Sequence, residues 1–463
     1  MKLDRIMIAA PKSGSGKTTI TCALLQAFKD EGKKVVSYKC GPDYIDPMFH
    51  QKVIDVPAKN LDTFFTDAAT TQKLLLKNRK EDELAIIEGV MGLYDGLGGI
   101  KEEGSSYHLA KVTKTPIILV VDAKGMGRSV IPLLAGFMAY DQEHLIKGVI
   151  LNRMSKSYYE MIKPLIENEL QIAVCGYFPD MKAFHVGSRH LGLMMPDEIS
   201  DIKVRLKKIS QELQKTVSVT SVLRIAENAA ECSHVMTEPE VRMEEGENRP
   251  LIAVARDEAF CFYYEDNLHL LEEYGARLTY FSPMHERRLP DGCCGLLLGG
   301  GYPELYADKL SQNVYMRHAI RKAVENKMPL VAECGGFMYL HSMLMDKEEK
   351  RYPMTGILPA KCYDTGKLVR FGYIELEGRT GHFLPSKERI KGHEFHYYDS
   401  EDNGADCLAI KPVSGRSAPC FVETENCFVG FPHLYYPSNP VVAKNFVKKA
   451  MEYKERIAHL QCT

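Results

Sequence analysis

The sequence predicts an α/β protein with two successive domains, each built around a parallel β-sheet covered by helices. Along the first half of the chain, short β-branched runs alternate with amphipathic stretches. These runs are apolar on both faces, as strands of a buried parallel sheet are. A second series of such runs begins near residue 250. The predicted strands are Ile6–Ala10, Val35–Tyr38, Leu84–Ile87, Ile117–Val121 and Val149–Leu151 in the first half, and Leu251–Ala255, Leu278–Phe281, Gly295–Leu298 and Leu330–Ala332 in the second.

The clearest helical pattern, Thr18–Asp30, follows the first predicted strand. Its apolar residues recur at i, i+3/i+4 and i+7/i+8, which places them on one face of a helix. These residues are Ile20, Ala23, Leu24, Ala27 and Phe28. Strands and helices in alternation are typical of βαβ units, so we expect the N-terminal domain to be a doubly wound parallel sheet.

A change in composition at Thr237–Arg249 predicts a domain boundary, because this segment is acidic, lacks periodicity and contains both Pro and Gly. Such a segment is typical of a linker. At 463 residues the chain is also too long for a single core. We therefore expect an N-terminal domain over residues 1–236, a linker over 237–249 and a C-terminal domain over 250–463.

The composition argues against several classes of protein. A formal net charge of −2 provides no general attraction to nucleic acid or to an acidic membrane. The 13 cysteines are scattered and odd in number, unlike a secreted disulfide framework, and no CxxC pair has zinc spacing. No run of 18 apolar residues is present, and the apolar N-terminal run is too short for a signal peptide. We expect a cytoplasmic protein without nucleic-acid or membrane partners.

A phosphate-binding loop is predicted between the first strand and the first helix, where residues 11–18 read PKSGSGKT. Consecutive backbone N–H groups and a helix N-terminus favour phosphate at such a loop. Lys17 is expected to reach the β- and γ-phosphates of ATP, and the Thr18 hydroxyl to bind Mg²⁺. Pro11 stands where the pattern usually has Gly, and the alternative is a glycine-rich turn without a ligand. The predicted ATP-binding residues of the loop are Ser13, Gly14, Ser15, Gly16, Lys17, Thr18 and Thr19.

Carboxylates and a lysine follow the second and third predicted strands of the N-terminal domain. The segment KCGPDYIDP, residues 39–47, and the segment EGVMGLYDG, residues 88–96, lie at the strand ends where ligands bind in such sheets. We predict that Lys39 contacts ATP and that Asp43 and Glu88 join Thr18 around Mg²⁺, which prefers a few oxygen ligands and retains water. For Asp46 and Asp95 the alternative is turn capping, which is common next to Gly or Pro.

Two further segments are candidates for ligand contact. Asn152 follows the fifth predicted strand and is expected to contact the adenine of ATP. The segment SRHLG, residues 188–192, is either a contact to nucleotide or substrate or an ordinary surface loop.

A nucleophile elbow is predicted in the C-terminal domain at Cys334. An apolar run ends at this cysteine, two glycines follow, and a helical apolar pattern begins. This is the strand–turn–helix arrangement that exposes a nucleophile, and the helix N-terminus is expected to lower the pKa of the thiol. A thiolate attacks a carboxamide carbon to form a thioester. The alternative for any single cysteine is a small buried hydrophobic residue.

The remaining parts of a thiol-dependent site are also present in the sequence. The loop LGGGYPE, residues 298–304, follows a predicted strand, and its glycine N–H groups suit an oxyanion. We predict oxyanion donors at Gly300, Gly301 and Gly335. His433, 99 positions after Cys334, is the predicted base.

Taken together, the motifs resemble the cobyrinic acid a,c-diamide synthase family over nearly the whole chain. They are SGSGKTT, KCGPDYIDP, EGVMGLYDG, SRHLGL, GGGYPE, AECGGFMYL, GHEFHYY and PHLYY, in this order. The resemblance implies a P-loop synthetase domain similar to dethiobiotin synthetase, followed by a flavodoxin-like domain of the class I glutamine amidotransferase type. It also implies that ATP and Mg²⁺ activate a tetrapyrrole carboxylate as an acyl phosphate, which ammonia from glutamine then displaces.

The resemblance further implies roles for individual residues. Cys334 is the nucleophile and His433 activates it. The positions that match the carboxylate-activating site of the family are Asp43, Ile45, Asp46, Glu88 and Asp95. The implied partners are ATP, L-glutamine and a tetrapyrrole acid such as cobyrinic acid, in cobalamin biosynthesis, with a monomer or homodimer as the assembly.

Two positions depart from the family pattern. Tyr435 stands where related triad glutaminases have a glutamate two positions after the histidine, and Tyr398 stands where a serine is usual. The third member of a catalytic triad is therefore missing or replaced.

Two alternatives remain. One is the same reaction on hydrogenobyrinic acid or nickel-sirohydrochlorin. The other, from a different class, is a partition-type ATPase, whose additional lysine Lys12 resembles. The cysteine elbow and the GGGYPE loop argue against a partition ATPase.

Overall fold

The computed structural model describes residues 2–80, 82–181, 196–232 and 249–462; side chains are not described for 196–200 and 461–462. The predicted contact segment at residues 188–192 and residues 237–248 of the predicted linker lie outside the described part. Contacts within the chain divide it into two compact units, Met1–Met236 and Thr237–Thr463. The two units are described separately below.

The N-terminal unit contains a seven-stranded sheet in the order β3-β2-β4-β1-β5-β6-β7, and every neighbouring pair is parallel. Its strands are β1 (Asp4–Ala9), β2 (Lys34–Cys40), β3 (Ala58–Leu61), β4 (Glu83–Glu88), β5 (Ile117–Asp122), β6 (Ile146–Asn152) and β7 (Ala173–Phe178). The five predicted strands are confirmed, and the structure adds β3 and β7. Strand β1 lies between β4 and β5, so the loops after β1, β2 and β4 meet at one edge of the sheet.

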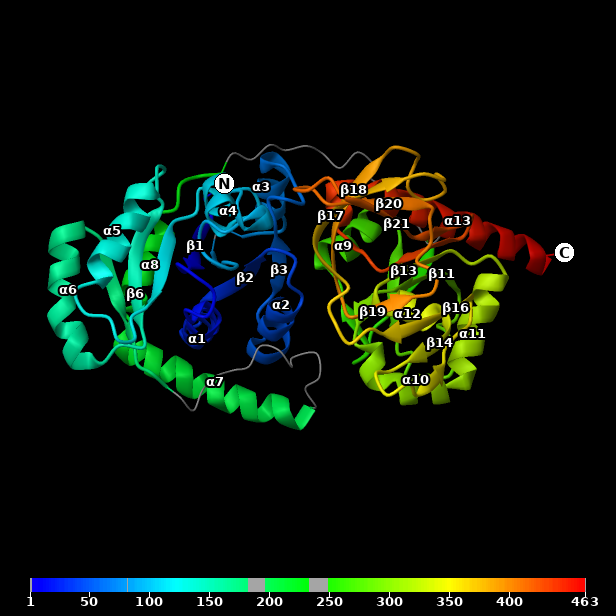
Figure 1. Ribbon diagram of the computed structural model, residues 1–463, viewed down its shortest axis with the longest axis horizontal. Helices are drawn as coiled ribbons and strands as arrows, with labels where there is room; N and C mark the ends of the chain where they lie inside the picture. Colours follow the sequence, from blue (N-terminus) through cyan, green and yellow to red (C-terminus); the bar gives the residue numbers. More distant parts are fainter. Residues whose placement is uncertain (1, 81, 182–195, 233–248, 463) are drawn as a thin grey trace. The chain divides into compact units, whose positions relative to one another are not determined.

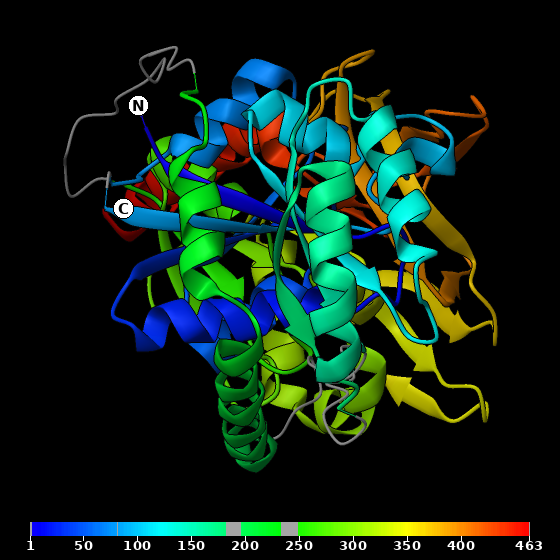
Figure 2. The same cartoon turned by 90° about the vertical axis from the view of Figure 1, so that its left-hand side faces the viewer.

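Helices cover both faces of this sheet. They are α1 (Lys17–Asp30), α2 (Ile45–Phe49), α3 (Ala68–Leu76), α4 (Ser106–Thr113), α5 (Val130–Tyr140), α6 (Lys156–Leu170), α7 (Pro196–Thr216) and α8 (Val219–Glu227), with a π-helical turn at His50–Ile54. One core cluster joins α1, α7 and α8 to the sheet, and the Ser210 hydroxyl donates to the Ala23 carbonyl at 3.1 Å. Figure 2 views this unit from the side of α5 and α6, and α7 lies next to α1 in both overviews (Figures 1 and 2).

The C-terminal unit contains a six-stranded sheet in the order β10-β8-β11-β13-β23-β22. Its strands are β8 (Leu251–Ala255), β10 (Arg277–Phe281), β11 (Cys293–Leu298), β13 (Leu330–Glu333), β22 (Val422–Glu423) and β23 (Cys427–Gly430). All neighbouring pairs are parallel except β22 with β23. The four predicted strands are confirmed, and with them the predicted α/β class of both units.

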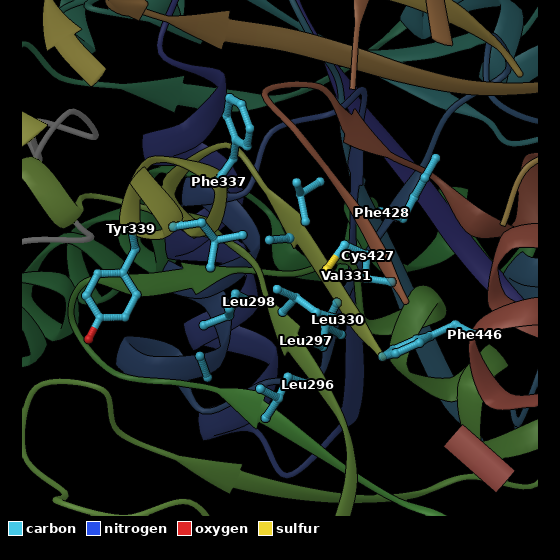
Figure 3. Close-up of a cluster of buried hydrophobic side chains, with 14 of the residues drawn as sticks. Leu296, Leu297, Leu298, Leu330, Val331, Phe337, Tyr339, Cys427, Phe428 and Phe446 are labelled. Atoms are coloured by element: carbon cyan, nitrogen blue, oxygen red, sulfur yellow. The ribbon is translucent and has the colours of Figure 1, made fainter. Parts of the chain in front are cut away.

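The core of this unit forms where its central strands meet the C-terminal helix. Figure 3 shows Leu296, Leu297 and Leu298 of β11 and Leu330 and Val331 of β13 in one cluster with Cys427 and Phe428 of β23 and Phe446. Phe446 belongs to α13 (Val441–Cys462). The other helices of the unit are α9 (Glu265–Glu273), α10 (Ala307–Gln312), α11 (Val314–Glu325) and α12 (Gly335–Leu340), with a 3₁₀ turn at Pro303–Tyr306.

Smaller sheets surround the parallel sheet of the C-terminal unit, and the sequence analysis did not predict them. One has the order β15-β14-β16-β19, one β21-β20-β17-β18-β24, and one pairs β12 with β9. Their strands are β9 (Phe260–Phe262), β12 (Gly300–Gly301), β14 (His341–Met345), β15 (Arg351–Pro353), β16 (Leu358–Asp364), β17 (Arg370–Gly378), β18 (Arg389–His396), β19 (Tyr398–Ser400), β20 (Cys407–Ile410), β21 (Ser417–Cys420) and β24 (His433–Leu434).

Two further observations concern the described residues of both units. None of their helices combines the length and the apolar character needed to cross a membrane. The cysteine side chains in this part of the chain are free thiols.

Candidate active sites

The loop between β1 and α1 has the backbone conformation of a phosphate-binding loop. Gly14 and Gly16 have φ angles of 77° and 95°, which L side chains rarely adopt. At Gly16 a Cβ atom would also lie 2.2 Å from the Asn152 side-chain nitrogen, so both conformation and space require glycine there. The loop therefore leads directly into the N-terminus of α1, with no side chain capping it.

Asn152, at the end of β6, is hydrogen-bonded to this loop. Its Nδ2 donates to the Ser15 carbonyl at 2.8 Å, and its Oδ1 accepts from the Arg153 backbone N–H at 3.0 Å. Arg153 in turn donates from Nε to Asp122 at 2.8 Å. Both polar atoms of the Asn152 amide thus have protein partners, and its contact to adenine stays a prediction.

Lys17 and Thr18 point from the start of α1 toward the end of β4. The Lys17 ammonium donates to the Met91 carbonyl at 2.5 Å, and the Thr18 hydroxyl donates to Glu88 Oε1 at 2.6 Å. Burial, and then the positive charge of Lys39, lower the pKa of Lys17 to about 8. An anionic phosphate would supply the counter-charge that this buried ammonium needs.

A buried charge cluster joins the ends of β2 and β4. Lys39 Nζ lies 2.5 Å from Asp46 Oδ2 and 2.9 Å from Glu88 Oε1, and all three side chains are buried. Burial alone would lower the pKa of Lys39, but the carboxylates of Glu88 and Asp46 outweigh it and hold that pKa above its ordinary value. Burial and the Asp46 carboxylate raise the pKa of Glu88 to about 7.

His50 completes this cluster, and the sequence analysis missed it. The residue begins the π-helical turn after α2. Its Nδ1 lies 2.8 Å from the Ser37 hydroxyl, and its Nε2 lies 3.5 Å from Glu88 Oε2. Burial lowers the pKa of His50 to about 4, so the ring is neutral beside Glu88. Only its position shortly after the KCGPDYIDP segment could have indicated it.

Asp43 and Asp95 form local turns at the same edge. Asp43 Oδ1 accepts the backbone N–H groups of Ile45 and Asp46 at 2.7 and 3.2 Å, and Asp95 Oδ2 accepts that of Gly92 at 2.9 Å. The capping alternative thus describes Asp95 in this structure, whereas Asp46 pairs with Lys39 instead. Ile45, the first residue of α2, packs against the core.

The oxygens of Thr18 and Glu88 fit a magnesium ion of the kind that accompanies ATP. Glu88 Oε2 is buried and has no hydrogen-bond partner among the described residues. No group of three or more His, Cys, Asp and Glu side chains in that part of the chain forms a closed metal cage. One hydroxyl and one carboxylate suit Mg²⁺, which fills its remaining positions with water and phosphate oxygens.

Cys334 lies in a strained turn between β13 and α12. Its φ and ψ angles are 48° and −104°, and its backbone N–H donates to the Gly430 carbonyl of β23 at 2.9 Å. The two glycines that follow permit close packing: a Cβ atom at Gly336 would lie 2.1 Å from the Leu298 carbonyl oxygen. Strand, strained cysteine and short helix form the predicted nucleophile elbow.

The structure brings the predicted oxyanion and base residues together beside this elbow. A Cβ atom at Gly335 would lie 3.1 Å from the Gly301 backbone nitrogen, and one at Gly300 would lie 2.3 Å from Cε1 of His433. Gly301 itself has a φ angle of 151° and lies against Ala259. The glycine loop therefore lies between the elbow and the histidine.

His433 lies in β24, which pairs with β18 so that His433 is opposite His393. The two imidazole rings stack with centroids 4.9 Å apart, and His393 Nδ1 lies 3.1 Å from the Tyr264 hydroxyl. Tyr435, where a triad glutamate would stand, donates to Asp266 at 3.2 Å. His393 was not among the predicted site residues; the GHEFHYY motif that contains it was the available signal.

The protonation states of this pair differ in part from expectation. Burial, and then the charge of Glu304, raise the pKa of the Cys334 thiol, so the predicted lowering by the helix N-terminus is wrong for this geometry. Burial, and then the neighbouring His393 and His396, lower the pKa of His433. The resting pair is a neutral thiol and a neutral imidazole. A neutral imidazole can accept the thiol proton, as a base must.

Comparison with known proteins places both sites in known families. Residues 6–193 match the family described as CobQ/CobB/MinD/ParA nucleotide binding domain, and residues 251–439 match the CobB/CobQ-like glutamine amidotransferase domain. The cobyrinate a,c-diamide synthase of Caldanaerobacter subterraneus subsp. tengcongensis is 38% identical over 96% of this chain and 98% of its own length. The proteins of the same name from Priestia megaterium and Thermoplasma volcanium are 34% and 35% identical, each over 98% of this chain and 99% of its own length.

Proposed function

The chain belongs to the cobyrinate a,c-diamide synthase family, and we propose that it amidates the a and c acetate carboxylates of cobyrinic acid through acyl phosphates. It is an ATP-dependent ligase that takes its nitrogen from glutamine, in cobalamin biosynthesis. The observation that carries the proposal is that one chain contains both a P-loop facing buried Glu88 and a cysteine elbow beside His433.

In the N-terminal unit, the phosphate loop binds and orients ATP. Backbone N–H groups of residues 13–19 surround the phosphates, and the Lys17 ammonium exchanges the Met91 carbonyl for a phosphate oxygen. The oxygens of Thr18 and Glu88 would hold Mg²⁺, which would supply positive charge to the transferring phosphoryl group. Asn152 keeps the loop in place through its bond to the Ser15 carbonyl, and it is the residue that we assign to adenine.

The carboxylate to be amidated is activated beside the same cluster. Asp43, Ile45, Asp46, Glu88 and Asp95 form the activating region. Asp43, whose Oδ1 accepts the N–H groups of Ile45 and Asp46, would be a further oxygen ligand of Mg²⁺. Lys39 is held between Asp46 and Glu88, so the position of its ammonium group is fixed before ATP binds.

In the C-terminal unit, Cys334 releases ammonia from glutamine. His433 accepts the thiol proton as sulfur attacks the carboxamide carbon, and N–H groups at Gly300, Gly301 and Gly335 stabilise the oxyanion. The proton then leaves with the ammonia, and a water molecule hydrolyses the thioester to glutamate.

This proposal assigns residues 1–236 to the synthetase domain, 237–249 to a linker and 250–463 to the glutaminase domain, in a cytoplasmic monomer or homodimer. Hydrogenobyrinic acid and nickel-sirohydrochlorin remain alternative substrates. A partition-type ATPase requires no thiol nucleophile and no base beside it, so the strained cysteine and the adjacent histidine argue against this alternative.

The test is mass spectrometry of tetrapyrrole acids incubated with the protein, Mg-ATP and glutamine. Cobyrinic acid should give two successive products, each lighter by roughly one mass unit because a hydroxyl becomes an amino group. A parallel reaction with each alternative acid identifies the ring that reacts fastest. The absence of an ATP-dependent product with every acid would contradict the ligase function.

A further inference from the structure

His50 contacts two side chains at the edge of the N-terminal sheet, and the function proposed above gives it no role. It is the first residue of the π-helical turn, and its side chain is fully buried. Its Nδ1 lies 2.8 Å from the Ser37 hydroxyl of β2, and its Nε2 lies 3.5 Å from Glu88 Oε2 of β4. The two ring nitrogens therefore contact different strands of the sheet.

Strand pairing explains why one histidine reaches both strands. Lys39 of β2 is opposite Glu88 of β4 in the parallel register. Ser37 precedes Lys39 by two positions, and alternate side chains of a strand point to the same face of a sheet. Ser37, Lys39 and Glu88 thus share a face, and the π-helical turn places His50 against it.

The two carboxylate oxygens of Glu88 have different surroundings. Oε1 accepts the Thr18 hydroxyl at 2.6 Å and lies 2.9 Å from Lys39 Nζ. Oε2 is buried and has no hydrogen-bond partner among the described residues, and the same is true of His50 Nε2. These two atoms lie 3.5 Å apart, so an approach of about 0.5 Å would give a hydrogen bond of ordinary length. Buried polar atoms are nearly always paired, which makes each the natural partner of the other.

The Ser37 hydroxyl fits the tautomer of His50 that this pairing requires. A neutral imidazole carries one N–H group, and an ionised carboxylate only accepts hydrogen bonds. With the proton on Nε2, the ring donates toward Glu88, and Nδ1 is free to accept the Ser37 hydroxyl. The other tautomer would place the lone pair of Nε2 against a carboxylate oxygen, which is unfavourable.

We propose that His50 is a positioning residue for magnesium binding: its Nε2–H group holds Glu88 Oε2 and leaves Oε1, beside Thr18, for the ion. This inference rests on the proposed ATP-dependent function, in which Mg²⁺ accompanies ATP. A carboxylate that is hydrogen-bonded through one oxygen presents the other in a fixed direction, and such outer partners raise the affinity for a metal. Lys39 cannot replace His50 in this role, because it contacts Oε1.

The test uses the different reach of asparagine and glutamine. The asparagine amide occupies the place of histidine Nδ1, and the glutamine amide that of Nε2. His50→Asn therefore keeps a polar group beside Ser37 but loses the donor to Glu88, whereas His50→Gln keeps that donor. Binding of a fluorescent ATP analogue to the full chain is measured at increasing Mg²⁺ concentration.

The two variants should differ in the Mg²⁺ concentration at half-maximal effect. For His50→Asn we expect an increase of about 10- to 100-fold, the usual effect of losing an outer partner of a metal ligand. His50→Gln should stay within about threefold of the wild type. Binding of the analogue without Mg²⁺ should be the same in all three proteins, because the phosphate loop is unchanged.

Two further variants complete the design. Ser37→Ala leaves the ring in place and removes the hydroxyl that fits its tautomer, so it should raise the Mg²⁺ requirement about threefold to tenfold. His108→Asn is the matched control. The Nδ1 of His108, in α4, also lies 2.8 Å from a hydroxyl, that of Thr63. This variant should bind the analogue and Mg²⁺ as the wild type does.

An unchanged Mg²⁺ requirement in His50→Asn, or an equal increase in His50→Asn and His50→Gln, would overturn the proposal. If His50→Asn does not fold, an unchanged requirement in Ser37→Ala would overturn it as well. The binding measurement needs no tetrapyrrole. A wild type that shows the expected Mg²⁺ responses but gives no amidated product would therefore contradict the ligase function while supporting the role of His50.

Discussion

The imidazole ring of His433 stacks on that of His393, with the ring planes 15° apart. The Tyr264 hydroxyl, 3.1 Å from His393 Nδ1, fixes the ring of His393. The stack then limits rotation of the His433 ring. In a glutaminase with Tyr435 at the usual glutamate position, this stack provides an alternative way to orient the base.

Replacement of His393 should therefore impair glutamine hydrolysis selectively. We expect His393→Ala to lower kcat for glutamine about tenfold through misplacement of His433. Water entering the gap should raise the pKa of His433, which burial and His393 now lower, and shift the acidic limb of the pH–rate profile to higher pH. His393→Phe keeps a stacked ring and should recover part of kcat. The exposed His382→Ala is the control, and an unshifted pH profile in His393→Ala would contradict the positioning role.

Gly300 provides a steric test of the same site. A Cβ atom there would lie 2.3 Å from Cε1 of His433, so Gly300→Ala must displace the ring. We expect about a 100-fold loss of glutamine hydrolysis with ammonium-dependent synthesis preserved. Gly136→Ala is the matched control, because a Cβ atom at that position in α5 meets nothing within 4 Å. Retention of full glutaminase rate in Gly300→Ala would show that His433 is not the base.

Cys334→Ala tests the independence of the two chemical steps. We expect it to abolish ammonia release from glutamine but to retain ATP-dependent amidation from added ammonium, because free ammonia bypasses the thioester. Product mass and glutamate formation are the two measurements. A folded variant that lost both activities equally would contradict separate sites.

Lys17→Ala should have the opposite effect. Without its ammonium the γ-phosphate loses its principal cation, so amidation should fail with glutamine and with ammonium alike. Binding of a fluorescent ATP analogue and product mass provide the measurements. Lys12→Ala, exposed in the same loop, should retain amidation; if it instead abolished ATP hydrolysis, the partition-type alternative would gain support.

The buried carboxyl group of Glu333, next to the nucleophile, should make the stability of the C-terminal unit depend on pH. Burial raises the pKa of Glu333 from 4.5 to about 8. Below pH 4.5 the group is protonated in both the folded and the unfolded chain. Between 4.5 and about 8 the unfolded chain ionises while the folded chain holds its proton, so the residue increasingly lowers the free energy of unfolding.

Glu333→Gln removes this ionisation while keeping an oxygen for the Tyr436 hydroxyl, 3.5 Å away. Its thermal midpoint relative to wild type should rise from pH 4.5 to about 8 and change little above that. Calorimetry of the C-terminal transition across this range is the measurement. A constant difference would mean that Glu333 does not retain its proton.

The parallel strands were predictable because their residues carry the signal locally. β1 and β5 are nearly continuous apolar runs, whereas β3 contains Lys59 and Asn60, whose burial depends on neighbouring strands. The smaller sheets of the C-terminal unit were not predicted for the same reason. β18 pairs with β17 and with β24, about 40 residues further on, and nothing local in β18 specifies that register.

The same distinction holds within the sites. The phosphate loop and the Cys334 elbow depend on glycines at fixed spacing, so a short segment was sufficient to predict them. His50 and His393 act through contacts with strands elsewhere in the chain, to Glu88 and His433, and no spacing rule connects them. The direction of the thiol pKa was also missed, because burial is a property of the folded unit and not of the motif.

The backbone hydrogen bond from Cys334 to Gly430 affects which changes of chain length the C-terminal unit can tolerate. Because β13 and β23 are adjacent, Cys334 and the segment that leads from Gly430 to His433 leave two neighbouring strands spaced about 4.8 Å apart. The 99 positions that separate the two residues in sequence do not enter that distance. Insertions, deletions or even new chain ends in the intervening smaller sheets, outside the β18 strand that holds His393 against His433, can therefore accumulate while the dyad stays in register, which leaves those parts open to evolutionary remodelling.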